Sequence, residues 1–585
     1  MEIEVQERGN VWEWRCYSMT DFETFAHDWL VVLINPQEAK EEVIINDPER
    51  LKRFYEDHKK DIWIGFNSRR YDQYILKGIL AGFNPKDIND WIIVEDKPGW
   101  QFSSVFRQIP LNNYDVKQNT DRGLKTFEGF MGNDIQESSV PFDIDRNLTE
   151  AEIAETVKYC RHDVEQTIEV FLNRLEEFDT MFYFMKHFHF PISDISKTKP
   201  QLAAKMLGGN GKGKNFNDEF KFPILDCLRL KKYKHVADWY RNPENHSYSK
   251  KQDGIMVAGV KHTFSWGGGH GARAKYSSSG IFLIIDVTAY YPSLQKQFKF
   301  GYRVMDNPEN FEFIHDSNVE FKRKGDKKAR QPFKIMDNAI SGQMKQKQSA
   351  LYDPMSNNSI CINGQLLLLD LVEHVEPYCE LIQDNTDGII VKLENYDSDF
   401  DRLDDVVYEW EQRTGMKMDF ETFIGDIYQK DVNNYLIIDR ETGAMKAKGG
   451  YVKKLGNLDY DLPIVNKAMV DFMVKGIPVE VTISKCNELK EFQQVKKISK
   501  LYKYIQHGDE ILKEKCVRCF ASKDESDGGL IKVHATTGRP AKIENTPAHS
   551  FLFNGSVEGV KCPRKLDKQW YIALATKRLK DFGVM

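Results

Sequence analysis

Residues 280–293, GIFLIIDVTAYYPS, decide the fold of the central part of the chain. The apolar run ends at Asp286, as in a buried strand with a carboxylate at its end, and Tyr291 follows five positions later. Residues 360–375, ICINGQLLLLDLVEHV, predict a helix, and residues 380–393, ELIQDNTDGIIVKL, predict two strands around a tight turn. The middle of the chain is therefore expected to be α+β.

The flanking regions have different patterns. WLVVLIN at 29–35 and IWIGF at 62–66 predict short buried strands, and residues 148–178 carry apolar residues at helical spacing, so the first part is expected to be α/β. Beyond residue 430, helical segments such as CNELKEFQQVKKISKLYKYIQ at 486–506 are expected to mix with short strands.

Length and composition limit the class of protein. At about 100–200 residues per domain, 585 residues predict three to five domains. No stretch approaches the roughly 18 consecutive apolar residues of a membrane span, and the acidic N-terminus does not resemble a secretory signal. Nine scattered cysteines form no disulfide framework, so we expect a soluble protein of a reducing compartment, the cytoplasm, with no membrane partner.

The charge is distributed unevenly. The net charge is −6 overall, but residues 431–585 hold 27 Lys/Arg against 19 Asp/Glu, a net of +8, which leaves −14 for residues 1–430. A basic tail beside an acidic remainder suits a protein that concentrates metal-binding carboxylates in one part and holds a polyanion with another.

Three segments in the first part carry carboxylates. Asp21 and Glu23, two apart on a strand, would point to one side and could share a divalent metal. Asp72 follows the strand at 62–66, and Tyr159 and Asp163 are four apart on one helix face. Four carboxylates suit two-metal phosphodiester hydrolysis, in which two hard cations lie roughly 3.5–4 Å apart and a tyrosine orients the water.

These segments resemble the Exo I, Exo II and Exo III motifs of proofreading 3′–5′ exonucleases. The resemblance implies an RNase H-like domain with Asp21, Glu23, Asp72 and Asp163 as ligands of two Mg²⁺ ions, for which Mn²⁺ can substitute, and with Tyr159 as the residue that orients water.

Residues 123–127, GLKTF, are similar to a single-strand-binding segment of the same enzymes, which normally begins with Ser or Thr where this chain has Gly123. The resemblance implies that Asn67, Leu124 and Phe127 contact the 3′ strand.

The segment from Asp286 to Ser293 resembles motif A of family-B DNA polymerases, DxxSLYPS. This implies that Asp286 holds both catalytic Mg²⁺ ions and that Tyr291 is the steric gate against a 2′-hydroxyl. Without other matches, a capped strand end with Tyr291 in the core would be the preferred interpretation.

Residues 334–342, KIMDNAISG, are similar to motif B, KxxxNSxYG, although Ala339 and Ser341 depart from it. On a helix, residues 330 and 334 face the same way, as a triphosphate clamp requires. The residues implied to bind the incoming nucleotide are Lys322, Arg330, Lys334 and Asn338.

Residues 383–388, QDNTDG, are similar to motif C, YxDTDS, with Asp387 as the second metal ligand and Thr386 beside it. Asn385 replaces the first aspartate, and Asp384 is expected to point to the other face of the strand. Residues 429–435 resemble the KKxY segment that holds the primer terminus, which implies that Tyr435 and Lys448 contact the primer.

The resemblance spans residues 21–449 and implies a multi-domain α/β and α+β architecture. The expected parts are an exonuclease domain at 1–190, a right-hand polymerase with its palm at 191–299 and 351–430 and its fingers at 300–350, and a thumb and basic C-terminal region at 431–585.

The implied function is that of a phage-type family-B DNA polymerase with a proofreading exonuclease, in the host cytoplasm, acting on primer-template DNA and dNTPs with two Mg²⁺ ions per active site. Two alternatives remain open. One is a 3′–5′ exonuclease whose degenerate polymerase half serves as a DNA-binding platform, which the departures at Asn385, Ala339 and Ser341 keep possible; the other is a structural DNA-binding protein with neither activity.

The spacing of the motifs predicts how synthesis starts. Asp286 and Lys334 are only 48 positions apart, and Gly342 and Asp387 only 45. A helical hairpin for the fingers already needs roughly 30 residues of the first interval at about 1.5 Å per residue. Since protein-primed relatives carry an insertion in each interval, we expect an enzyme that extends an ordinary nucleic-acid primer and depends on a helicase or processivity factor on duplex templates.

Overall fold

The structure is a computed structural model that describes residues 16–19, 22–118 and 120–584. The chain divides into two compact units. Unit 1 extends to Thr198 and includes 455–463 and 486–570; unit 2 comprises 199–454, 464–485 and the residues from Tyr571 onward. The predicted mixture of α and β structure over several domains is confirmed, and the region predicted as thumb contributes to both units.

Unit 1 contains a six-stranded mixed sheet with the strand order β2-β3-β1-β5-β6, in which β4 pairs with the free side of β3. The neighbours β1, β5 and β6 run parallel, whereas β3 is antiparallel to β1, β2 and β4. The strands are β1 (Cys16–Met19), β2 (Glu23–Thr24), β3 (Trp29–Asn35), β4 (Lys40–Ile45), β5 (Ile62–Gly65) and β6 (Asn112–Asp115). The two strands predicted at 29–35 and 62–66 are thus confirmed as β3 and β5.

The long helix predicted at 148–178 is confirmed as α5, which passes into α6 after Arg174. A capping box starts α5: Thr149 Oγ1 accepts the backbone N–H of Glu152, and the Glu152 carboxylate accepts the N–H of Thr149. Its apolar face packs on β3 through Leu30, Val32, Cys160, Val164 and Ile168. The helices of this part are α1 (Pro48–His58), α2 (Asp72–Leu80), α3 (Pro85–Asn89), α4 (Leu124–Met131), α5 (Glu150–Asn173) and α6 (Leu175–His187).

Residues 486–570 add two small antiparallel sheets to unit 1, with the orders β16-β19-β22 and β18-β17-β20-β21. The helix predicted within 486–506 is wrong: this segment forms a short 3₁₀ turn and then β16 and β17. Pairing of β16 with β19 and of β17 with β20 overrides the local spacing of apolar residues. The strands are β16 (Gln494–Lys497), β17 (Tyr502–His507), β18 (Glu510–Ile511), β19 (Cys516–Ala521), β20 (Leu530–His534), β21 (Pro540–Lys542) and β22 (Ser550–Leu552).

A buried arginine joins β19 to the end of α4. Arg518 Nη2 donates to the carbonyl oxygens of Gly129 at 3.0 Å and Asn133 at 2.7 Å, and Nη1 donates to that of Gly555 at 2.6 Å. Burial lowers the pKa of Arg518 to about 10. The C-terminal sheets therefore help to position α4, which carries Leu124 and Phe127.

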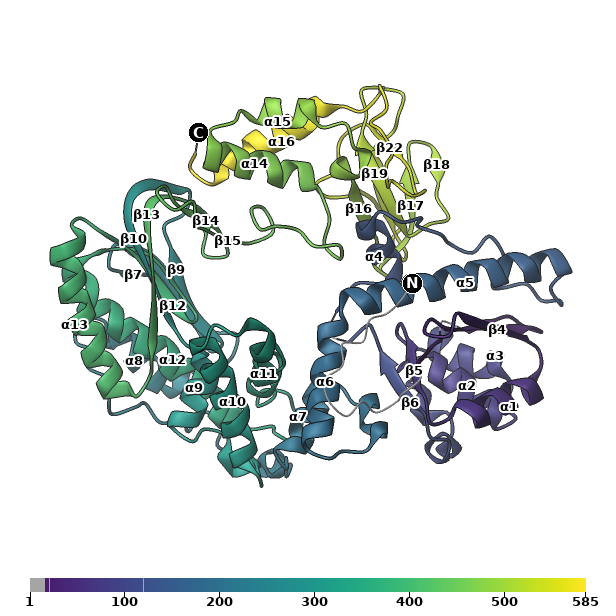
Figure 1. Ribbon diagram of the computed structural model, residues 1–585, viewed down its shortest axis with the longest axis horizontal. Helices are drawn as coiled ribbons and strands as arrows, with labels where there is room; N and C mark the ends of the chain where they lie inside the picture. The colour runs from purple at the N-terminus through teal and green to yellow at the C-terminus, as the bar shows by residue number, and fades with distance from the viewer. Residues whose placement is uncertain (1–15, 20–21, 119, 585) are drawn as a thin grey trace. The chain divides into compact units, whose positions relative to one another are not determined.

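Unit 2 is built on a nine-stranded antiparallel sheet with the order β15-β14-β13-β10-β12-β11-β9-β8-β7 (Figure 1). The strand predicted at 280–287 is the second half of β10, and the predicted strand pair at 380–393 is confirmed as β11 and β12. The strands are β7 (Lys251–Val257), β8 (Val260–Ser265), β9 (Gly268–Ala272), β10 (Tyr276–Val287), β11 (Glu380–Asn385), β12 (Gly388–Leu393), β13 (Met418–Asp431), β14 (Asn434–Asp439) and β15 (Met445–Lys448).

The two faces of this sheet differ. Leu283, Ile285 and Val391 belong to the main core, together with side chains of α8 (Lys234–Arg241), α12 (Pro354–Val375) and α13 (Tyr396–Thr414). Phe282 and Ile284 alternate with Leu283 and Ile285 along β10, so they point to the other face of the sheet, where they belong to a smaller apolar cluster. Asp286 shares that second face, so its carboxylate lies on the side of the sheet away from α12.

The predicted helix at 360–375 is confirmed as the C-terminal part of α12, and the expected helical hairpin within 300–350 is formed by α10 and α11. The helices of unit 2 are α7 (Lys199–Met206), α8 (Lys234–Arg241), α9 (Tyr290–Gln297), α10 (Pro308–Arg323), α11 (Lys327–Ser341), α12 (Pro354–Val375), α13 (Tyr396–Thr414), α14 (Pro463–Lys475), α15 (Val479–Lys485) and, for most of its length, α16 (Lys568–Asp581). None of the helices in the described ranges is long and apolar enough to cross a membrane.

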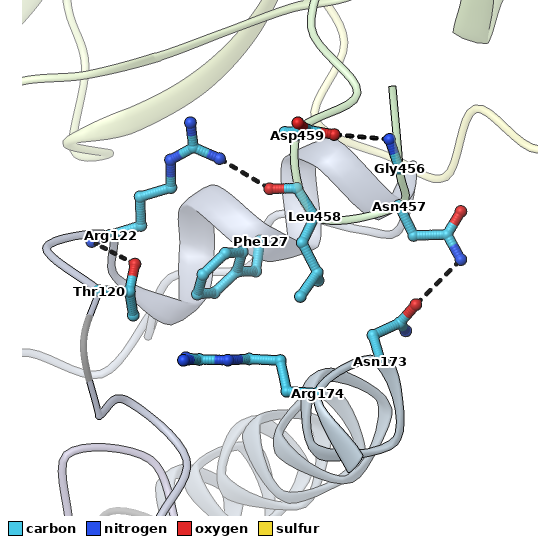
Figure 2. Close-up of a pocket in the computed structure, with 9 residues that line it drawn as sticks. All are labelled: Thr120, Arg122, Phe127, Asn173, Arg174, Gly456, Asn457, Leu458 and Asp459. Carbon is cyan, nitrogen blue, oxygen red and sulfur yellow. Dashed lines mark hydrogen bonds between the residues drawn. The ribbon is translucent and has the colours of Figure 1, made fainter. Parts of the chain in front are cut away.

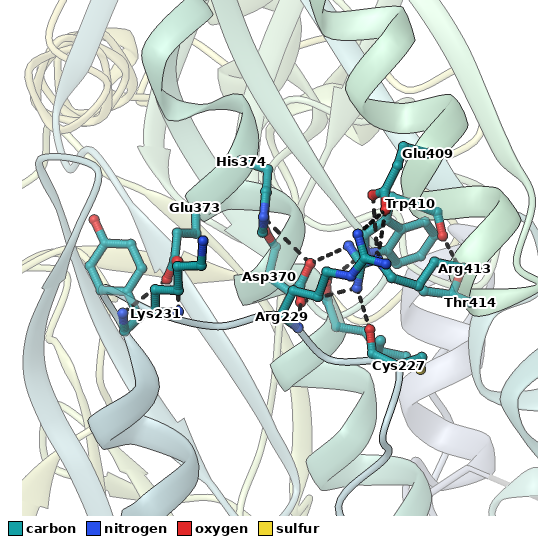
Figure 3. Close-up of polar contacts among 12 residues, drawn as sticks. Cys227, Arg229, Lys231, Asp370, Glu373, His374, Glu409, Trp410, Arg413 and Thr414 are labelled. Atoms are coloured by element: carbon teal, nitrogen blue, oxygen red, sulfur yellow. Dashed lines mark hydrogen bonds and ion pairs between the residues drawn. The ribbon is translucent and has the colours of Figure 1, made fainter.

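A buried ion pair ties α12 to α13 (Figure 3). Arg413 Nη2 donates to Asp370 Oδ1 at 2.8 Å, and the Asp370 side chain is fully buried. Asp370 also accepts the backbone N–H of Arg229, and Glu373 accepts that of Lys231 at 2.7 Å. The pair therefore fixes the helices behind the sheet and the extended segment that crosses them.

Candidate active sites

The first predicted site lies in unit 1. Asp21 falls outside the described residues. Glu23 lies in β2 and Asp72 is the first residue of α2, and both are buried. The backbone N–H of Phe22 donates to Asp72 Oδ1 at 2.8 Å, so the strand that follows Asp21 and the start of α2 are held together.

Asp163 and Tyr159 lie on one face of α5, as predicted, and Lys125 from α4 contacts both. Lys125 Nζ is 2.5 Å from Asp163 Oδ1 and 4.7 Å from the centre of the Tyr159 ring. Burial raises the pKa of the Asp163 carboxyl, whereas the Lys125 charge opposes that rise. Burial lowers the pKa of Lys125, but the carboxylates of Asp163 and Glu128 together raise it above its usual value.

Among the described residues, one group of side chains could hold a metal ion: Glu128, His162 and Asp163, whose ligand atoms lie within 4.8 Å of one another. Glu23 and Asp72 are not in this group. The sequence interpretation missed Lys125, Glu128 and His162, although Lys125 lies within GLKTF and His162 directly precedes Asp163. Nothing in a local motif indicates that these three converge, because α4 and α5 meet only in the folded chain.

The predicted strand-binding residues are adjacent to one another. Asn67 has a left-handed backbone, with φ of 66°, which asparagine tolerates, and its N–H donates to Asp115 Oδ1 at 2.8 Å. Phe66 meets Phe127 of α4 edge to face, with ring centres 6.1 Å apart. The loop that carries Asn67 and the helix that carries Leu124 and Phe127 therefore lie side by side.

A pocket of about 460 Å³ adjoins α4 (Figure 2). Its lining includes Phe127 and the guanidinium groups of Arg122 and Arg174. Arg122 Nη1 donates to the carbonyl of Leu458 at 2.7 Å, and Arg174 donates to the carbonyl of Val116 at 2.7 Å. Part of this hydrogen-bonding capacity is therefore used within unit 1, and the pocket is a basic, partly aromatic extension of the predicted strand-binding segment.

The second predicted site lies at one end of the nine-stranded sheet. Asp286 near the end of β10 pairs in register with Gly388, the first residue of β12. Thr386 and Asp387 form the two-residue turn between β11 and β12, and the N–H of Val287 donates to the carbonyl of Asp387 at 2.8 Å. The backbone thus holds the two predicted metal ligands at adjoining strand ends.

Gly388 makes this proximity possible. A Cβ at residue 388 would overlap the carbonyl oxygen of Ile285 and Oδ1 of Asp286. Asp384, as predicted, points away: it is buried, and its Oδ2 lies 3.3 Å from His262 Nε2.

The sequence interpretation missed three charged residues beside Asp286. Asp419 pairs with Asp286 across β10 and β13, and Glu421 lies two positions on, on the same face. Lys446 Nζ is 3.3 Å from Asp286 and 3.0 Å from Glu421. The alternation Asp419-Phe-Glu421 is a signal for a strand with both carboxylates on one face, but only the sheet order places it against β10.

The surroundings of Asp286 shift the pKa of its carboxyl. Its burial raises the pKa of the carboxyl, Lys446 lowers it, and the neighbouring charges of Asp387 and Glu421 raise it again. Carboxylate oxygens suit hard divalent cations, so Asp286 and Asp387 could hold one. Among the described residues, neither belongs to the group of side chains whose ligand atoms lie within 4.8 Å of one another.

The two tyrosines after Asp286 have different environments. Tyr290 is 4% exposed and donates its hydroxyl to the carbonyl of Gly364 at 2.6 Å. Tyr291 is only partly buried and reaches the carbonyl of Gly267 at 3.5 Å. Tyr291, not Tyr290, is therefore the side chain placed near the β8–β9 turn at the edge of the site.

The predicted nucleotide-binding cations lie on the α10–α11 hairpin. Arg330, Lys334 and Asn338 follow one another at four-residue intervals along α11, so they share one face. Lys334 and Asn338 are exposed. Lys322, near the end of α10, forms an ion pair with Asp419, so it lies at the carboxylate end of the sheet.

The predicted primer-binding residues pair with each other, Tyr435 in β14 with Lys448 in β15. Burial raises the pKa of Tyr435 to about 12. The lysine that reaches Asp286 is Lys446, on the same face of β15 as Lys448.

No model of a known protein family matches this chain, and no curated protein is significantly similar to it. The functional interpretation therefore rests on its own residues.

Proposed function

We propose that the chain is a DNA-directed DNA polymerase with a 3′–5′ proofreading exonuclease, of the phage-type family-B kind that its motifs resemble. The observation that carries the proposal is the junction of β10 with the β11–β12 turn. Asp286 and Asp387, 101 positions apart, lie at adjoining strand ends joined by a backbone hydrogen bond of 2.8 Å from residue 287 to residue 387.

The two carboxylates would hold Mg²⁺, which when bound would activate the primer 3′-hydroxyl and neutralise charge on the transferred phosphate. Arg330 and Lys334 supply cations on one helix face for the triphosphate, and this matches the chemistry that the reaction requires. Tyr291 contributes a ring at the edge of the site that can exclude a 2′-hydroxyl by contact.

The exonuclease half of the proposal rests on unit 1. Its mixed sheet, with β1, β5 and β6 parallel and β3 antiparallel, supports an RNase H-like assignment. Buried Glu23, Asp72 and Asp163 with Tyr159 supply hard ligands and a phenol for Mg²⁺-assisted hydrolysis.

The proposal includes the mode of priming. The hairpin of α10 and α11 occupies most of the interval between Asp286 and Gly342. We therefore propose extension of an ordinary nucleic-acid primer, with a helicase or processivity factor as partner on duplex templates.

The test is a labelled primer annealed to a longer template, incubated with Mg²⁺ and with or without dNTPs. Extension with dNTPs and shortening from the 3′ end without them is the expected result. Shortening under both conditions would favour the second candidate, a nuclease with a non-catalytic polymerase half. Two observations favour that candidate: Asn385 lacks the expected charge, and Lys446 already neutralises part of the charge of Asp286. Absence of both reactions would refute both enzymatic functions.

A further inference from the structure

A chain of buried polar side chains runs through the α10–α11 hairpin and ends on Arg330. Arg330 Nε donates to Asn318 Oδ1 at 2.9 Å, and Asn318 Nδ2 donates to Asp337 Oδ2 at 2.9 Å. His315 Nδ1 lies 3.1 Å from the same oxygen of Asp337. His315, Asn318 and Asp337 are 4%, 3% and 0% exposed, so water does not compete for these contacts.

The carboxylate sets the direction of the chain. The Asn318 amide turns its NH₂ group toward Asp337, whose Oδ2 accepts the hydrogen bond. This orientation leaves Asn318 Oδ1 facing Arg330, where it accepts the Nε–H. Since Nε is engaged, the planar guanidinium is oriented and its two terminal nitrogens are left for a bidentate contact with phosphate.

At its other end the chain reaches the segment after Asp286. His315 Nε2 lies 3.4 Å from Ser293 Oγ, which donates to the carbonyl of Thr288 at 2.7 Å. A serine, a histidine and an aspartate in this order resemble a nucleophilic triad, but the Ser293 hydroxyl proton is directed to Thr288, not to the histidine. We therefore assign Ser293 a structural role.

We propose that Asn318 and Asp337 are positioning residues that aim Arg330 at the triphosphate of the incoming nucleotide. This rests on the proposed polymerase function, in which Arg330 binds the triphosphate. Asn318 does not touch the nucleotide; it acts through the orientation of Arg330, and Asp337 acts through the orientation of Asn318.

The experiment is a double-mutant cycle in steady-state primer extension, with variants Asn318→Ala, Arg330→Ala and the combination. We expect Asn318→Ala to raise KM for dNTP by about tenfold, with a smaller change in kcat, because a hydrogen bond to a charged group is lost. In the Arg330→Ala background the same change should have no further effect. Asn310→Ala on the same helix is the control, because its amide bonds the carbonyl of Met206 at 2.8 Å.

Asp337→Leu is the second variant: it keeps the approximate size of the side chain and removes the oxygen that accepts from Asn318. Without that acceptor the Asn318 amide is no longer held with Oδ1 toward Arg330, so KM for dNTP should rise as it does in Asn318→Ala. If the wild-type chain extends primers, additive effects of Asn318→Ala and Arg330→Ala would overturn the inference and leave the proposed function intact. An unchanged KM for dNTP in Asn318→Ala and Asp337→Leu would do the same. A wild-type chain that extends no primer would overturn both.

Discussion

Lys446 Nζ lies 3.3 Å from Asp286 Oδ2, although the two residues are 160 positions apart. The contact depends on the strand order β15-β14-β13-β10. The chain reverses direction between β13 and β14 and again between β14 and β15, and this brings Lys446 to face the carboxylate. Asp286, the predicted metal ligand, therefore has a positively charged neighbour that no local sequence motif predicts.

The first prediction concerns pH. Burial raises the pKa of Asp286 and Lys446 lowers it, so Lys446→Met should raise it further. A carboxyl with a higher pKa loses its charge at higher pH, and we expect the acid limb of the kcat/KM profile for extension to move to higher pH. Lys417→Met, which removes the ion pair between an exposed lysine and Glu411, is the control. An unmoved acid limb in Lys446→Met would show that Asp286 does not govern it.

The second prediction is that the two activities separate. Changing Asp21 and Glu23 to alanine should lower digestion of single-stranded 3′ ends by at least about 100-fold while extension persists, because loss of metal ligands costs more than loss of residues around them. Asp387→Asn should do the reverse. Loss of extension in a folded Asp21→Ala, Glu23→Ala chain would contradict the model of two independent sites.

The third prediction concerns the sugar. Tyr291→Ala should raise ribonucleotide incorporation relative to deoxyribonucleotide by roughly 10–200-fold, and Tyr291→Phe should change it little, because the ring excludes a 2′-hydroxyl by contact. Tyr290→Ala should instead destabilise the core, where the Tyr290 hydroxyl binds the carbonyl of Gly364. The check is competition between ATP and dATP on one template. A relaxed choice in Tyr290→Ala alone would place the gate one residue earlier.

The fourth prediction tests the junction of the strand ends. Gly388→Ala should reduce extension by about 100-fold, because the new Cβ would displace the Asp286 carboxylate. The exonuclease activity of the same variant should be unchanged. Gly450→Ala, where a Cβ meets nothing within 4 Å, is the matched control. Full extension by Gly388→Ala would mean that the position of Asp286 is not critical.

The fifth prediction concerns stability. Arg413→Leu should leave the buried charge of Asp370 uncompensated and destabilise unit 2 by about 3–5 kcal/mol. Hydrogen exchange of α12 and α13 measures the effect locally. Glu409→Ala removes a half-exposed carboxylate that pairs with Arg413 and with Arg229 and should change exchange by less than about 1 kcal/mol. Equal protection in Arg413→Leu and wild type would show that the pair contributes little.

Several elements could be predicted from the sequence because their signals are local. The apolar run that ends at Asp286, the helical spacing of 360–375 and the turn at Thr386-Asp387 all lie within a few residues of the structures that they form. The capping box at Thr149 is equally local.

What only the tertiary structure decided depends on pairing between distant segments. The spacing of apolar residues in 486–506 predicts a helix, but the segment forms β16 and β17 because these strands pair with β19 and β20. The same cause placed Lys446 beside Asp286, and Lys125 beside Asp163. The sequence by itself determined which residues lie at the ends of strands and on the faces of helices. The pairing of strands and the packing of helices decided which charged side chains meet there. These contacts join residues far apart in the sequence, and no local pattern indicates which distant residue will be the partner.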